Sequence, residues 1–226
     1  MDSKKKSARI AGLLYLLLAI TGGFGIMYIP SSIQVTGDAT ATANNIVTSE
    51  FTFRLSMISN LVSSVLYIFL ALALGRLFKE VDAKYVKLML SLVIIAVPIG
   101  IVNVINLIAA QSLAGGTDFL GTFEQEQRND LALFFLNLYN RGLSLAGIFW
   151  GLWLYPFGML VIKSKFIPKI IGILLIIGCF AYVLDSFLTL LLPEYRKMLA
   201  DYLMIPLAIG EFSIIFWLLI KGVKNT

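Results

Sequence analysis

Six long apolar runs, separated by short polar connections, constrain this chain more than any other feature of its sequence. An α-helix needs about 20 apolar residues to cross the hydrocarbon core of a bilayer. Backbone groups within lipid must be hydrogen-bonded internally, and the runs lack the strict alternation of barrel strands. The sequence therefore predicts an all-α integral membrane bundle of six transmembrane helices. These helices are expected at residues 8–29, 53–78, 86–110, 131–162, 168–192 and 199–220.

The composition agrees with lipid as the solvent and excludes several classes of function. Apolar residues make up 59% of the 226 residues and charged residues 14%, with a mean hydropathy of +0.90, which exceeds what a soluble core can bury. The net charge is +5, and the Lys and Arg residues are scattered between the apolar runs. The expected partner is therefore a bilayer surface, and no nucleic-acid partner is expected. The chain has no histidine and a single cysteine, Cys179, so no disulfide, His-ligated metal or other cofactor is expected.

Basic residues gather on one side of the expected bundle. If six helices cross the membrane, 13 of the 18 Lys and Arg residues fall on the side of both termini. They are Lys4, Lys5, Lys6, Arg9, Arg76, Lys79, Lys84, Lys87, Lys163, Lys165, Lys169, Lys221 and Lys224. The positive-inside rule predicts that this side, with the N- and C-termini, is cytoplasmic. The outer connections 30–52, 111–130 and 193–197 are too short for a soluble domain, so residues 1–226 are expected to form a single six-helix transmembrane domain.

The fourth run, residues 131–162, is longer than a bilayer requires. It is expected to tilt, protrude or bend near Pro156, because proline cannot donate a helical hydrogen bond. Gly147 and Gly151 are four residues apart, a spacing typical of helices that pack closely. The preferred interpretation is packing between helices of one monomer, and the second is dimerisation. An interfacial aromatic belt is expected near the inner end of this run, formed by Trp150, Trp153, Tyr155 and Phe157.

Three charged residues lie inside the apolar runs, where a charge is costly and normally faces the bundle interior, an ion-pair partner or a solute path. At about 1.5 Å per residue, Arg141 and Glu211 lie about 15 Å deep, and Asp185 lies about 10 Å below the outer end of its helix. Amides accompany them at helical spacing in the third and fourth runs. The predicted site is an outward-opening polar pocket lined by Asn103, Asn106, Asn137, Asn140, Arg141, Asp185 and Glu211.

The charges in this pocket do not balance. A central charge costs about 2.5–3.5 kcal/mol on insertion scales, and an opposite pair at about 4 Å gains about 4 kcal/mol at an effective dielectric of about 20. Arg141 can neutralise Glu211 or Asp185, so one carboxyl must be protonated, hydrated, or matched by a bound cation or Arg54. The alternative interpretation is that a buried ion pair fixes helix register and that the amides join helices. The sequence leaves both open.

Several short motifs follow one another along the chain: ARIAGLLY at 8–15, GLWLYPFG at 151–158, SKFIP at 164–168, YVLDS at 182–186 and IGE at 209–211. Their order and spacing resemble those of the bacterial membrane family catalogued as domain of unknown function 4386. The resemblance covers nearly the whole chain and implies a multi-pass protein of the bacterial inner membrane. It supplies no substrate, reaction or catalytic residue, and it leaves Asp185 and Glu211 as the matched ionisable positions.

Three classes of function are compatible with these residues. The preferred one is binding or translocation of a small amphiphile, lipid or ion, with Arg141 anchoring an anionic or polar head group and Asp185 and Glu211 as counter-charges. The second is a noncatalytic interaction or regulatory subunit with a membrane partner protein, in which the buried charges are structural. The third is an intramembrane enzyme that uses Asp185 and Glu211 as an acid/base pair. No catalytic residue is predicted, because the chain lacks the G-x-S-x-G, P-loop, H-E-x-x-H and dinucleotide motifs.

Overall fold

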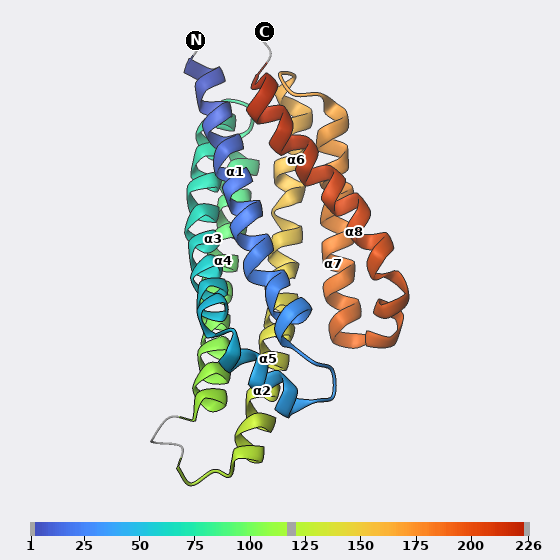
Figure 1. The fold of residues 1–226 in the computed structure, drawn as a ribbon. Coiled ribbons are helices and arrows are strands. Elements are labelled where there is room, and N and C mark those ends of the chain that lie inside the picture. Colours follow the sequence, from blue (N-terminus) through green and yellow to red (C-terminus); the bar gives the residue numbers. More distant parts are fainter. Residues whose placement is uncertain (1–2, 117–120, 224–226) are drawn as a thin grey trace. The chain divides into compact units, whose positions relative to one another are not determined.

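The computed structural model describes residues 3–116 and 121–223, which are almost entirely helical and contain no strand. The helices are α1 (Ser3–Tyr28), α2 (Ala39–Thr48), α3 (Glu50–Phe78), α4 (Ala83–Gly115), α5 (Gln125–Leu152), α6 (Leu154–Ser164), α7 (Lys169–Leu191) and α8 (Pro193–Phe216), with π-helical turns η1 (Ile29–Ile33) and η3 (Trp217–Lys221) (Figure 1). Among the described residues, six helical segments are long and apolar enough to cross a membrane. They are α1, α3, α4, α5 continued by α6, α7, and α8 continued by η3. The six predicted spans are therefore confirmed by length and composition.

The connection between the first two spans, residues 30–52, contains a helix that the apolar pattern of the sequence does not predict. Helix α2 begins after Asp38, whose carboxylate accepts a hydrogen bond of 2.8 Å from the backbone N–H of Ala41. An acidic N-cap satisfies one of the free N–H groups at a helix start. Gly37 supplies the positive φ of 77° needed in the turn before this cap. The short apolar face of α2, with Ile46 buried, carries too few residues to stand out as a span.

The fourth span is interrupted where the sequence predicted a bend. Helix α5 ends at Leu152 and α6 begins at Leu154, with Trp153 between them. Pro156 explains the position of the break, because it has no N–H to donate to the carbonyl of Leu152 one turn earlier. The next bond is restored, since the N–H of Phe157 donates to the carbonyl of Trp153 at 3.3 Å.

The described chain groups into two compact units. Unit 1 comprises Met1–Leu18, Val65–Pro98 and Ser144–Thr226, and unit 2 comprises Ala19–Ser64 and Ile99–Leu143. Helices α1, α3, α4 and α5 each contribute one part to either unit. The single-domain organisation stays a prediction.

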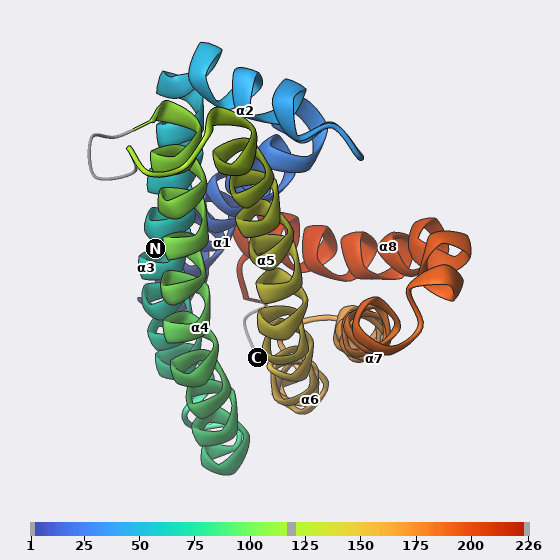
Figure 2. The ribbon, with the colours of Figure 1, turned by 90° about the horizontal axis from the view of Figure 1, so that it is seen from below.

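Unit 1 is held together by glycines that let helix backbones approach closely. A Cβ on Gly158 in α6 would lie 2.6 Å from the carbonyl oxygen of Gly172 in α7, and a Cβ on Gly172 would meet Gly158 in the same way. A Cβ on Gly147 would lie 2.7 Å from the hydroxyl oxygen of Ser186, and one on Gly151 would lie 2.6 Å from Cβ of Tyr182. Helix α7 packs against α6 and α8 in the same unit (Figure 2). The predicted close packing at Gly147 and Gly151 within the monomer is thus confirmed.

The basic ends of several helices meet within unit 1. The Lys4 ammonium lies 3.7 Å from the Glu80 carboxylate, and the Lys163 ammonium lies 2.6 Å from the Asp82 carboxylate. These contacts join the start of α1 and the end of α6 to the connection between α3 and α4 (Figure 1). The hydrogen bond from Lys163 holds the pKa of Asp82 below its usual value of 3.8. The structure therefore brings part of the predicted basic side together; Lys224 lies outside the described residues.

Unit 2 has an apolar core between the four longer helices and the connection that carries α2. Its buried members come from η1, α2, α3, α4 and α5, the largest include Phe53 and Tyr139, and the partly buried Tyr28 at the end of α1 packs against them. The carbonyl oxygen of Gly25 on α1 accepts hydrogen bonds from the Asn60 amide on α3 at 3.0 Å and from the Tyr139 hydroxyl on α5 at 3.3 Å. Such bonds between helices are typical of membrane bundles, where lipid offers polar groups no partner.

Candidate functional site

A carboxyl group surrounded by tyrosines is the most unusual polar feature of unit 1. Glu211 lies near the middle of the last span and is half-buried. The hydroxyls of Tyr15 on α1 and Tyr182 on α7 approach its carboxyl group, and Tyr67 on α3 lies close by. Among the described residues, Glu211 has no Lys or Arg within ion-pair distance. A carboxyl in a membrane span without a fixed counter-charge must take its balancing charge from a proton or a mobile cation.

The tyrosine hydroxyls around Glu211 have unused hydrogen-bonding capacity. Tyr15 is 1% exposed and Tyr67 is 5% exposed. Neither hydroxyl makes a hydrogen bond of good geometry, although the Tyr15 hydroxyl faces the carboxyl of Glu211. Buried polar groups normally find a partner, and an unsatisfied one costs about 1–3 kcal/mol. This cluster of Glu211 with Tyr15, Tyr67 and Tyr182 is called the Glu211 cluster below.

Aromatic rings form one wall of the Glu211 cluster. The Trp153 ring centroid lies 5.8 Å from that of Tyr15 and 5.1 Å from that of Tyr67, and Trp153 stacks on Phe157 at 5.4 Å. Trp153 is 3% exposed and Phe157 is fully buried. The predicted interfacial belt was therefore wrong for these two residues, because the break after α5 lets both rings point into unit 1. The local sequence identifies Trp153 and Phe157 as aromatic residues of this span, but it does not specify whether the side of the helix that carries them faces the protein or the lipid.

Asp185 is paired with Arg196, which is not among the predicted site residues. The Arg196 Nε lies 3.0 Å from Oδ1 of Asp185, and Nη2 lies 3.5 Å from Oδ2. Arg196 belongs to the first turns of α8, just after the sharp connection from α7, so the pair closes the α7–α8 hairpin (Figure 1). Both side chains are partly exposed. The 11-residue separation across Pro193 was the signal that could have identified this hairpin contact.

The sequence left open whether Arg141 neutralises Glu211 or Asp185; within unit 1, Asp185 pairs with Arg196. Arg141 is exposed and forms no ion pair with the described residues of unit 2. Its predicted function as an anchor for a head group stays a prediction.

The four predicted amides lie in unit 2 and are joined by hydrogen bonds. Asn103 donates to the carbonyl oxygen of Tyr139 at 2.9 Å, and its own Oδ1 accepts from Asn106 at 3.0 Å. Gln34, which follows η1, donates to Oδ1 of Asn137 at 2.9 Å and accepts from Nδ2 of Asn140 at 2.8 Å. The bond from Asn103 to Tyr139 joins α4 to α5, as in the alternative in which the amides join helices, and the Gln34 bonds join the segment after η1 to α5. Nothing in the local sequence marked Gln34, because it lay in an expected outer loop.

The seven predicted pocket residues therefore fall into separate groups. Asp185 and Glu211 belong to unit 1, where Tyr182 faces Glu211 and lies one helical turn from Asp185. The four asparagines and Arg141 belong to unit 2. A single pocket lined by all seven stays a prediction. In the described part of the chain, no three His, Cys, Asp or Glu residues are grouped as metal ligands.

Comparisons with known proteins identify a family but no activity. The model of a family described as "Domain of unknown function (DUF4386)" matches residues 10–222. An "Uncharacterized protein" from Archaeoglobus fulgidus is 37% identical over 82 residues, which cover 36% of this chain and 47% of that protein. The match thus spans about half the length of that relative. No solved structure matches this chain.

Proposed function

This chain belongs to the DUF4386 family, whose description names no activity, and we propose that it is a multi-pass membrane protein that binds or moves a small cation or cationic amphiphile at Glu211. One observation carries this proposal: a carboxyl group within a membrane span faces tyrosine hydroxyls and has no Lys or Arg partner in the described part of the chain. In this function Glu211 exchanges a proton for a cationic group.

The chemistry of the Glu211 cluster suits such an exchange. A charged carboxylate in the middle of a span costs several kcal/mol, so its proton is retained until another positive charge arrives. Phenol hydroxyls of Tyr15 and Tyr182 can donate to the carboxylate once it is ionised. Aromatic faces also attract cations, and Trp153 lies against Tyr15 and Tyr67. The cluster therefore offers both a counter-charge and an aromatic surface to a cationic group.

The experiment measures cation binding and proton release with the full chain in detergent. Sodium, potassium and the lipophilic cation tetraphenylphosphonium are titrated in weakly buffered solution, with calorimetry and a pH-sensitive dye as readouts. We expect one of them to bind with release of a proton, and Glu211→Gln to weaken binding at least tenfold and abolish the release. Glu50→Gln is the matched control, because this substitution makes the same chemical change at a carboxylate that pairs with Arg54 at the surface.

Unchanged binding in the Glu211→Gln, Asp185→Asn double variant would refute the proposal. Tyr182→Phe keeps the ring and removes the hydroxyl, so it should weaken binding less than Glu211→Gln does. Proteoliposomes loaded with the bound cation then separate translocation from binding.

A second candidate function is a noncatalytic interaction subunit with structural polar groups. The Asp185–Arg196 pair and the hydrogen-bonded asparagines favour it, because these groups already satisfy one another. In that function Glu211→Gln changes only thermal stability, and a membrane partner protein co-purifies with the chain.

The topology proposed here places the start of α1, η3 and the connections α3–α4 and α6–α7 on the cytoplasmic side of a bacterial inner membrane. The support is the excess of Lys and Arg on these segments, together with the contacts Lys4–Glu80 and Lys163–Asp82 that bring three of them together.

A further inference from the structure

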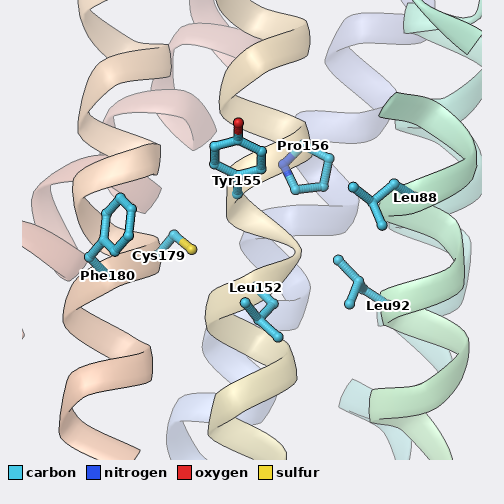
Figure 3. Close-up of a pocket in the computed structure, with 7 residues that line it drawn as sticks. All are labelled: Leu88, Leu92, Leu152, Tyr155, Pro156, Cys179 and Phe180. Carbon is cyan, nitrogen blue, oxygen red and sulfur yellow. The ribbon is translucent and has the colours of Figure 1, made fainter. Parts of the chain in front are cut away.

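An apolar groove opens on the surface of unit 1 beside the break between α5 and α6. Its volume is about 350 Å³, at the lower end of the range of small-molecule sites. Figure 3 shows its walls: Leu88 and Leu92 from α4, Leu152 from α5, Tyr155 and Pro156 from α6, and Cys179 and Phe180 from α7. Apart from the Tyr155 hydroxyl and the Cys179 thiol, these side chains have no polar group.

The groove faces outward from its unit within the membrane-spanning part of the chain. Leu88 is 44% exposed and Phe180 is 66% exposed, and both belong to predicted spans. In a bilayer, a groove on the exposed side of a span would meet lipid chains. Its apolar walls suit an acyl chain and offer nothing to a charged or strongly polar solute.

One end of the groove is basic and aromatic. Lys84, Leu88 and Leu92 follow one another at intervals of four residues, so they lie on one face of α4. Lys84 is exposed, lies one turn nearer the start of α4 than Leu88, and forms no ion pair among the described residues. The Tyr155 ring packs edge-on against Tyr85 at 6.4 Å.

The second lysine at this end is already neutralised. The Lys163 ammonium lies 4.5 Å from the ring centroid of Tyr85 and is paired with Asp82. Lys84 therefore supplies the uncompensated charge. In Figure 3 the Tyr155 hydroxyl points away from Leu152, as a polar tip near a membrane interface does.

We propose that this groove is a binding site for an anionic phospholipid, with one acyl chain along Leu88, Leu92 and Phe180 and the phosphate beside Lys84. The choice of occupant follows from charge complementarity: a zwitterionic lipid fills the apolar walls equally well but gains less from the lysine. A basic side chain near anionic lipid head groups contributes about 1 kcal/mol, which corresponds to about a fivefold preference.

Native mass spectrometry of the full chain tests the charge at the site, with phosphatidylglycerol and phosphatidylcholine added at equal concentrations. We expect the protein to retain one phosphatidylglycerol, and Lys84→Gln to lower its preference for that lipid about fivefold. Lys87→Gln is the matched control: Lys87 is also exposed on α4, but at about 100° per residue it lies about 100° around the helix from Leu88 and about 140° from Leu92, whereas Lys84 lies about 40° and 80° from them. Equal losses in the two variants would overturn the proposal, because they indicate a general attraction of basic surface to anionic lipid.

A second pair of variants tests the groove itself. Leu88→Trp places a larger ring in the groove, whereas Ile94→Trp makes a similar change at a 67% exposed position of α4 that does not line it. We expect only Leu88→Trp to reduce retention of both lipids. Equal retention in the two tryptophan variants, or a second protein helix in the groove shown by a stable dimer, would contradict a lipid site. If Leu88→Trp does not fold, the comparison of Lys84→Gln with Lys87→Gln decides the question.

Discussion

Replacing Gly142 with alanine tests the polar contact between α4 and α5 in unit 2. A Cβ at position 142 would overlap Oδ1 and Cγ of Asn103 and would lie 2.8 Å from its Nδ2. Contacts this short do not occur, so the Asn103 amide must move. Asn103 is 6% exposed and holds its position through hydrogen bonds to Tyr139 and Asn106, and both bonds are lost when it moves.

Opposing effects set the size of the change in the free energy of unfolding. The bond from Asn103 to Tyr139 joins α4 to α5 and the bond from Asn106 lies within α4, and the two are worth about 1–3 kcal/mol together. Residual overpacking costs about 1–3 kcal/mol, and the better helix propensity of alanine returns about 1 kcal/mol. We expect Gly142→Ala to destabilise the protein by about 3 kcal/mol. In an Asn103→Ala background the obstructing amide is absent, so the same substitution should stabilise by about 1 kcal/mol through helix propensity alone.

Equilibrium unfolding in mixed micelles, followed by circular dichroism, measures all four proteins of this double-mutant cycle. Gly23→Ala is the control, because a Cβ there meets nothing within 4 Å and should be mildly stabilising in both backgrounds. The decisive result is the change of sign at position 142. If Gly142→Ala is equally destabilising with and without the Asn103 side chain, the contact described here does not explain the need for glycine.

Two further predictions concern the hairpin pair and the topology. Arg196→Gln should lower the free energy of unfolding by about 1 kcal/mol or less, because the ion pair with Asp185 is partly exposed. In an Asp185→Asn background the same substitution should have no effect. Thermal unfolding measures both, and equal effects in the two backgrounds would contradict a direct pair. In a Cys179→Ser background, a membrane-impermeant maleimide added to intact cells should label Glu124→Cys and leave Lys79→Cys unlabelled. The opposite labelling pattern would reverse the proposed orientation.

Much of the candidate site depended on contacts that local sequence does not specify. Glu211 and Asp185 were recognised as costly charges because their positions inside apolar runs are visible in the sequence. Their neighbours were not: Asp185 binds Arg196 across a hairpin, and Glu211 meets Tyr15 and Tyr182 from two other helices. The sequence around Trp153 is compatible with a ring that faces lipid or protein. In the structure the break after α5 directs the ring into the protein.

The sequence by itself determined the six membrane spans, the interruption near Pro156 and the small residues that permit close helix packing. These follow from local chemistry, because lipid requires long self-satisfied helices, proline removes a donor, and glycine has no Cβ. Only the tertiary structure decided which polar groups meet. A helical sequence fixes which residues share a face, but the rotation and depth of each helix against its neighbours come from packing over the whole unit. A difference of one residue in depth moves a side chain by about 1.5 Å and turns it by about 100°, which is enough to exchange one ion-pair partner for another.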